Sequence, residues 1–258
     1  MVRGLLASVM VGILCAVMGT YVVLRGMAFL GDAMAHAILP GVAIAFLLHG
    51  NLLIGAVVAA VIIALSIGLF SRGGMVKEDT AIGILFAAAL SLGVALISSI
   101  QTYAVDLSHI LFGNVLGVSQ GDLWLTASLG LLVLAAVALF YKQFLVISFD
   151  PILAATLRLP AELLRNLMLV LLALTVVVSL QTVGVGLAAA MLITPAATAY
   201  LLTRRLAPMM FISAAIGAVS SLAGLYFSYY FNVVSGSAIV LTATAIFLAV
   251  FLVKRGRR

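Results

Sequence analysis

Asp32 and His36 are two ionisable residues that stand four positions apart in an otherwise apolar run. On an α-helix, positions i and i+4 share one face with Cβ atoms about 6 Å apart, so the two side chains are expected to point the same way. An ionisable side chain placed in hydrocarbon costs about 2.5–3.5 kcal/mol. The pair is therefore expected to have a task at this position.

The chemistry that suits this pair is cation binding. Carboxylate oxygens and imidazole nitrogens are ligands that divalent manganese, zinc and iron accept, and the donor set does not choose among the three. The sequence thus predicts that Asp32 and His36 lie on the path of a cation. The alternative is a structural hydrogen bond between them that locks a pair of helices.

One carboxylate and one imidazole supply fewer donor atoms than the about four to six that these cations take. A two-fold axis along a pore would bring a second Asp32 and a second His36 to the same ion, or water would complete the shell. Because a conducting site must release its ion, we expect weak and transient binding.

The composition is that of a membrane protein. Of the 258 residues, 66% are hydrophobic and 8% are charged, whereas a soluble domain carries about 25% charged residues. The net charge of +6 comes from Lys and Arg that are dispersed between apolar segments. This dispersal favours a role in setting topology over nucleic-acid binding. We expect one integral-membrane domain over residues 1–258.

Nine apolar segments have the length of about 17–25 residues that a membrane-spanning helix needs. The first extends to Leu24, longer than the about 7–15 apolar residues of a signal peptide, and is interpreted as a spanning helix. Residues 166–203 would form one helix of about 57 Å, so they are expected to turn within 181–186. The predicted spans are 5–24, 27–48, 52–71, 80–100, 123–141, 166–183, 185–203, 209–228 and 237–253.

The positions of Lys and Arg predict the orientation of these spans. Apart from Arg3, the basic residues fall in every second connection and in the C-terminal tail, which should face the cytoplasm. The connections that lack Lys and Arg are 49–51, 101–122, 184–186 and 229–236. This alternation predicts a cytoplasmic C-terminus and an external N-terminus.

Two connections are too long to be simple turns, and the first is residues 101–122. Its centre, Leu107 to Val118, is amphipathic enough for a short helix at the outer face. We expect an external gating segment at about 105–118, with a surface loop as the alternative. His109 lies there, where a surface position is favoured over a role in receiving metal.

The second long connection is residues 142–165. Asp150 and Pro151 suit the N-cap and first position of a helix, and Pro160 predicts where that helix stops. The helix would have about two turns and a length of about 12 Å, too short to span a membrane. It is suited to project into a groove of another protein, but these residues alone favour a plain surface helix.

Five blocks, taken together, carry a resemblance to a known family. They are Leu24–Gly41, Glu78–Ile84, His109–Gly117, Phe149–Pro151 and Gly186–Pro195, in this order along the chain. In combination they resemble the permease subunits of manganese, zinc and iron ABC importers. The similarity covers essentially the whole chain.

The resemblance implies an all-α, polytopic and homodimeric permease in the bacterial inner membrane. It assigns Asp32 and His36 to the metal site of the translocation path. It also makes residues 149–159 a coupling helix seated in an ATPase. The coupling residues that we expect are Phe149, Asp150, Pro151, Leu153, Leu157 and Arg158.

The same resemblance implies three protein partners in addition to membrane lipid: a second copy of the chain, an ABC ATPase and an extracytoplasmic metal-binding protein. The residues agree at one independent point, because the sequence has no Gly-x-x-x-x-Gly-Lys-Ser/Thr phosphate loop. We therefore expect a transport subunit that is not an enzyme. The metal is its cargo, and no permanently bound cofactor is expected.

The alternatives to this function come from two other classes. A self-contained, proton-coupled transporter of divalent metals would use Asp32 as its proton carrier and would need no ATPase. An intramembrane hydrolase would need a His-Glu-x-x-His zinc site or a serine nucleophile motif. We expect that the chain has neither kind of hydrolase site, so the hydrolase is the least favoured class.

Overall fold

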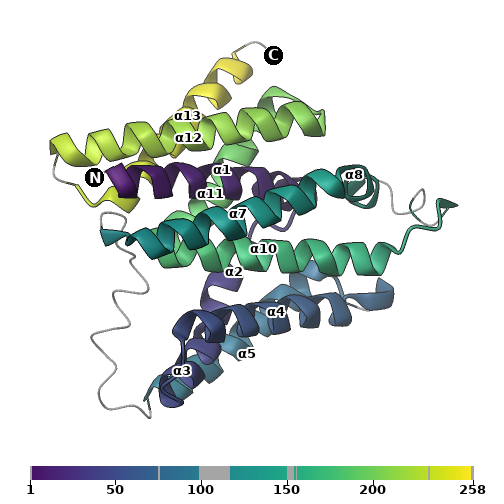
Figure 1. The fold of residues 1–258 in the computed structure, drawn as a ribbon. Helices are drawn as coiled ribbons and strands as arrows, with labels where there is room; N and C mark the ends of the chain where they lie inside the picture. The colour runs from purple at the N-terminus through teal and green to yellow at the C-terminus, as the bar shows by residue number, and fades with distance from the viewer. Residues whose placement is uncertain are drawn as a thin grey trace. The chain divides into compact units, whose positions relative to one another are not determined.

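The computed structural model describes residues 2–74, 76–98, 117–149, 154, 156–231 and 233–256, and every regular element in these ranges is a helix (Figure 1). The all-α expectation is confirmed. The helices are α1 (Val2–Leu24), α2 (Leu30–Ala37), α3 (Leu39–Leu47), α4 (Leu52–Phe70), the 3₁₀ helix η1 (Arg72–Gly74), α5 (Glu78–Ser98), α7 (Gln120–Leu139), α8 (Tyr141–Phe149), α10 (Ala161–Val183), α11 (Val185–Leu202), α12 (Leu206–Phe231) and α13 (Ser235–Arg255).

Within the described ranges, nine helical spans are long and apolar enough to cross a membrane, with α2 and α3 counted as one. Their number and order confirm the sequence prediction. The predicted turn inside residues 166–203 is also present, because α10 ends at Val183 and α11 begins at Val185. Gly184 between them has a φ of 84°, a left-handed conformation that glycine adopts without steric cost.

Helix α4 shows how these spans are built for lipid. Its buried face is made of small residues such as Ala56, Ala60 and Ala64, and its exposed face carries large aliphatic residues such as Ile54 and Val58. Small residues let helices approach closely, while an outward aliphatic surface is stable in hydrocarbon. The pattern is that of a helix whose outer face meets lipid.

The chain forms two compact units. The first combines Met1–Ala28, His109–Leu132 and Val178–Arg258, and the second combines Phe29–Ser108 and Val133–Val177. The Asp32 and His36 pair and the segment that leads into α10 both belong to the second unit.

In the first unit, α1 packs against α11 and α12, and α13 packs against the same two helices. Buried hydroxyl groups join α12 to the backbone of α1. The Oγ of Ser213 donates to the carbonyl oxygen of Ala16 at 2.8 Å, and the Oγ of Ser221 donates to that of Ser8 at 3.0 Å. Such interhelical hydrogen bonds stabilise helix pairs where no water competes.

In the second unit, α2 and α3 pack against α4 and α5. The crossing of α3 and α4 is centred on Gly41 and Gly55, where a Cβ on either residue would collide with the carbonyl oxygen of the other. Only glycine permits this separation of the two backbones. The contact fixes α3, and through α3 it helps to position α2.

Helix α8 was not predicted, because residues 142–149 were interpreted as part of a connection. Helical hydrogen bonding continues from α7 into α8, with the amide of Phe144 donating to the carbonyl of Phe140 at 2.8 Å. Phe144 and Ile147 are buried. Their burial stabilises a helix whose polar residues, such as Lys142, resemble those of a loop.

Candidate metal-transport site

Asp32 and His36 lie on one face of α2, as their spacing predicts. The Nε2 atom of His36 is 3.8 Å from the Oδ1 atom of Asp32. The His36 side chain is 29% exposed and the Asp32 side chain is 44% exposed. That distance is within ion-pair range but too long for a hydrogen bond. Both side chains therefore keep atoms that can bind a metal ion, and an ion can reach them because both are partly exposed.

Phe86 of α5 holds the histidine ring from the side. Its ring makes an edge-to-face contact with His36 at 6.1 Å between centroids, and another with Phe29 at 5.4 Å. Edge-to-face pairs of this kind are directional. The sequence analysis did not identify Phe86, because it comes from a different helix 50 positions after His36.

The span that carries the pair is broken just after His36. Pro40 has no N–H, so the helical bond from residue 40 to the His36 carbonyl is absent. The amide of Ile38 donates to that carbonyl instead, and α3 restarts at Leu39. The C-terminal end of a helix carries partial negative charge, and broken helices in transporters use such ends to attract cations.

In the described part of the chain, no third ligand of the usual kind completes the pair. Among the residues that the structure describes, no group of three or more His, Cys, Asp and Glu side chains is placed to hold a metal ion. One carboxylate and one imidazole alone leave several coordination positions open.

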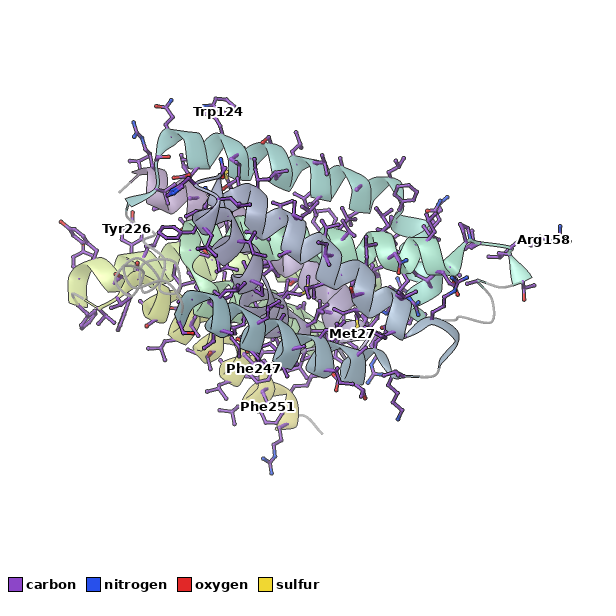
Figure 2. All side chains as sticks on the ribbon, turned by 90° about the horizontal axis from the view of Figure 1, so that it is seen from below. Met27, Trp124, Arg158, Tyr226, Phe247 and Phe251 are labelled. Atoms are coloured by element: carbon purple, nitrogen blue, oxygen red, sulfur yellow. The ribbon has the colours of Figure 1, made fainter. Side chains whose placement is uncertain are left out.

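Three of the six predicted coupling residues can be placed. Phe149 ends α8 and is 53% exposed, and Leu157 is 55% exposed. Arg158 has a φ of 52°, and the amide of Leu159 donates to the carbonyl of Ala154 at 3.0 Å. This pattern closes the end of a helical turn. Figure 2 shows Arg158 at the tip of a segment that projects beyond the N-terminal end of α10.

The remaining coupling residues, Asp150, Pro151 and Leu153, lie outside the described residues. So does most of the predicted external segment at 105–118, including His109.

The expectation that no serine nucleophile motif is present was wrong as a statement about sequence. Residues 117–121 read Gly-Val-Ser-Gln-Gly and match Gly-x-Ser-x-Gly. In the structure, the Oγ of Ser119 donates to Asp122 at 2.7 Å and accepts the Asp122 amide at 3.1 Å. This is a helix capping box at the start of α7, and the strand that precedes a nucleophile elbow is missing from the described part of the chain.

Sequence reasoning also treated Arg165 only as a topology signal. Its side chain is 17% exposed, and its guanidinium donates from Nη2 to the Gly68 carbonyl at 2.8 Å and lies 3.6 Å from the Glu78 carboxylate. An arginine side chain this deeply buried is rare in proteins unless it is paired. The available signal was a single arginine directly before the predicted span 166–183.

Comparison with known proteins finds similarity over nearly the whole chain. The family model described as "ABC 3 transport family" matches residues 1–254. "Manganese transport system membrane protein MntC" of Halalkalibacterium halodurans is 50% identical over 249 residues, which is 96% of this chain and 85% of that protein.

Two further similarities cover most of the chain. "Probable iron transport system membrane protein" of Haemophilus influenzae is 39% identical over 248 residues, which is 96% of this chain and 91% of that protein. Among solved structures, "PsaBC from Streptococcus pneumoniae in complex with Fab" aligns with a TM-score of 0.84 at 43% identity, covering 96% of this chain and 90% of that one.

Proposed function

The chain belongs to the ABC 3 transport family, and from that premise we propose that it is the permease subunit of an ATP-driven importer that carries a divalent transition metal into the cytoplasm. The observation that carries the proposal is the Asp32 and His36 pair, 3.8 Å apart on one face of a broken membrane span. These two side chains can bind an ion within a membrane span, where hydrocarbon would otherwise exclude it.

Manganese is the cargo that we propose. Relatives that are 50% identical to this chain carry manganese transport in their names. A mixed oxygen and nitrogen donor set accepts manganese, and it also accepts zinc and iron. The relative from Haemophilus influenzae is named for iron, so all three metals belong in a competition assay.

The proposed assembly is a two-fold dimer of a single permease domain, residues 1–258. Two copies of Asp32 and His36 would then share one ion at the pore axis. ATP hydrolysis is assigned to a separate ATPase that contacts residues 149–159 on the cytoplasmic side. An extracytoplasmic metal-binding protein delivers the ion to the face that carries the N-terminus.

The test is to isolate the tagged chain from its own membrane and to measure manganese uptake by proteoliposomes with and without internal ATP. We expect an ATPase to co-purify in fixed proportion, and uptake to require ATP. Uptake without an ATPase, driven by a proton gradient alone, would instead identify the self-contained transporter with Asp32 as its proton carrier.

Pro40→Ala tests whether the break after His36 serves transport. Alanine supplies the missing N–H, so α2 and α3 are expected to join into one helix, in which residue 40 donates to the His36 carbonyl in place of Ile38. We expect manganese uptake to fall about threefold, a loss of ion stabilisation of the size that a helix end supplies. Uptake and membrane abundance are measured together, and unchanged uptake contradicts a role for the break.

A further inference from the structure

Arg165 ties the N-terminal end of α10 to α4 and α5. Its Nη2 donates to the carbonyl of Gly68 at 2.8 Å, and its Nη1 donates to that of Ser71 at 3.4 Å. Its Nε lies 3.6 Å from Oε1 of Glu78, and both side chains are less than one-fifth exposed. One guanidinium therefore contacts the end of α4, the residue after it and the start of α5.

The chemistry of these partners suits arginine in particular. The last carbonyls of α4 have no helical donors, and they carry the negative end of the helix dipole. Glu78 adds a full negative charge in the first turn of α5. A planar guanidinium with five N–H donors can serve these groups at once, whereas the ammonium of lysine is a single point of charge.

Two weaker contacts flank Arg165. The Asn166 side chain lies against Gly68, where a Cβ would collide with its amide. Arg72 pairs with Glu162 at 3.0 Å, but these side chains are 65% and 54% exposed. An exposed pair contributes little to stability, so Arg165 is the stronger of the two ionic links.

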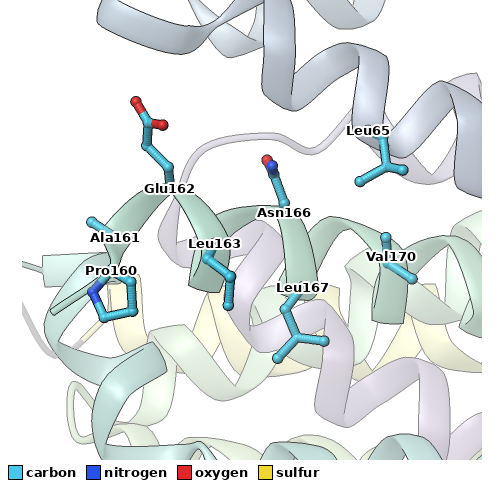
Figure 3. Close-up of a pocket in the computed structure, with 8 residues that line it drawn as sticks. All are labelled: Leu65, Pro160, Ala161, Glu162, Leu163, Asn166, Leu167 and Val170. Atoms are coloured by element: carbon cyan, nitrogen blue, oxygen red, sulfur yellow. The ribbon is translucent and has the colours of Figure 1, made fainter.

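Away from this end, α10 and α4 are separated by an open groove of about 750 Å³. Figure 3 shows Glu162 and Asn166 extending from α10 toward α4, with Leu65 and Val170 farther along the groove. In the described part of the second unit, α10 is not among the helices that pack closely against α4 or α5. The Arg165 cluster is thus a contact through which motion of α10 can reach those two helices.

Both ends of this connection matter for the proposed function. Residues 149–159 precede α10 directly, and Pro160 marks the junction. At the other end, α5 packs against α2 and presents Phe86 to His36. We infer that Arg165 is a positioning residue that transmits movement of the 149–159 segment through α4 and α5 to the Asp32 and His36 pair. This inference rests on the proposed function.

The test compares Arg165→Gln and Arg165→Lys with Arg72→Gln, a matched removal of the exposed pair. Each permease is reconstituted with its co-purified ATPase, and manganese uptake and ATP hydrolysis are measured on the same vesicles. We expect Arg165→Gln to lower the amount of manganese moved per ATP by about fivefold, a typical size for coupling between sites. Arg165→Lys should lose less, and Arg72→Gln should retain the ratio of the unaltered protein.

An unchanged ratio in Arg165→Gln would overturn the inference. So would a parallel fall in uptake, hydrolysis and assembled complex, because a purely structural contact predicts that outcome. Glu78→Gln provides a second measure, since it removes one partner and leaves the carbonyl contacts in place. Failure of the proposed function itself would be distinct, because the unaltered protein would then show no ATP-dependent uptake.

Discussion

Replacing Asp32 or His36 with alanine is expected to abolish most manganese uptake while the amount of permease in the membrane stays normal. Both side chains are partly exposed and make no hydrogen bond with each other at 3.8 Å, so truncation leaves no buried cavity or orphaned partner. Losing one ligand should remove at least about 1.4 kcal/mol of ion binding, which is about tenfold in uptake. Radioactive manganese uptake and quantitative immunoblotting of membranes measure the two quantities.

Two substitutions sharpen this result. Asp32→Asn keeps the shape of the side chain and removes its charge, so it should fail nearly as badly as Asp32→Ala. His49→Asn is the matched control, because His49 is an exposed histidine in the connection between α3 and α4 with a φ of 50° that asparagine tolerates. Normal uptake by both alanine variants would reduce the Asp32 and His36 pair to a packing feature of α2.

The positions of the spans could be predicted because hydrocarbon imposes one rule on every crossing segment. Each must satisfy its own backbone hydrogen bonds, so a long apolar run becomes a helix whatever its neighbours are. The turn at Gly184 followed from length alone. The common face of Asp32 and His36 followed from a spacing of four, which is also a local property.

Features that depend on distant partners could not be predicted in the same way. The ring of Phe86 meets His36 only after α5 has packed on α2. Arg165 was read as a charge that sets topology, because its partners Gly68 and Glu78 lie far away in the chain. Helix α8 was missed since its stability depends on burying Phe144. The role of Asp32 and His36 as metal ligands also depends on partners that are distant in the chain, and it stays a prediction.

Among glycine-to-alanine substitutions in the described helices, Gly19→Ala is expected to destabilise the fold most. Gly19 lies on α1 where that helix crosses α11, and a Cβ there would collide with the backbone carbonyl of Leu192. Backbone cannot move aside as a flexible side chain does, so the overpacking should cost about 1–3 kcal/mol or more. The expected result is a lower melting temperature of the purified permease and reduced abundance in the membrane.

The same substitution at Gly83 separates this steric effect from the intrinsic preference of alanine for helices. Gly83 lies within α5, and a Cβ there would meet no other atom within 4 Å. Alanine is favoured over glycine in a helix by about 1 kcal/mol, so Gly83→Ala should be neutral or stabilising. Opposite signs for the two variants support the close crossing of α1 and α11. A Gly19→Ala protein as stable as the unaltered permease would mean that these helices are farther apart than described.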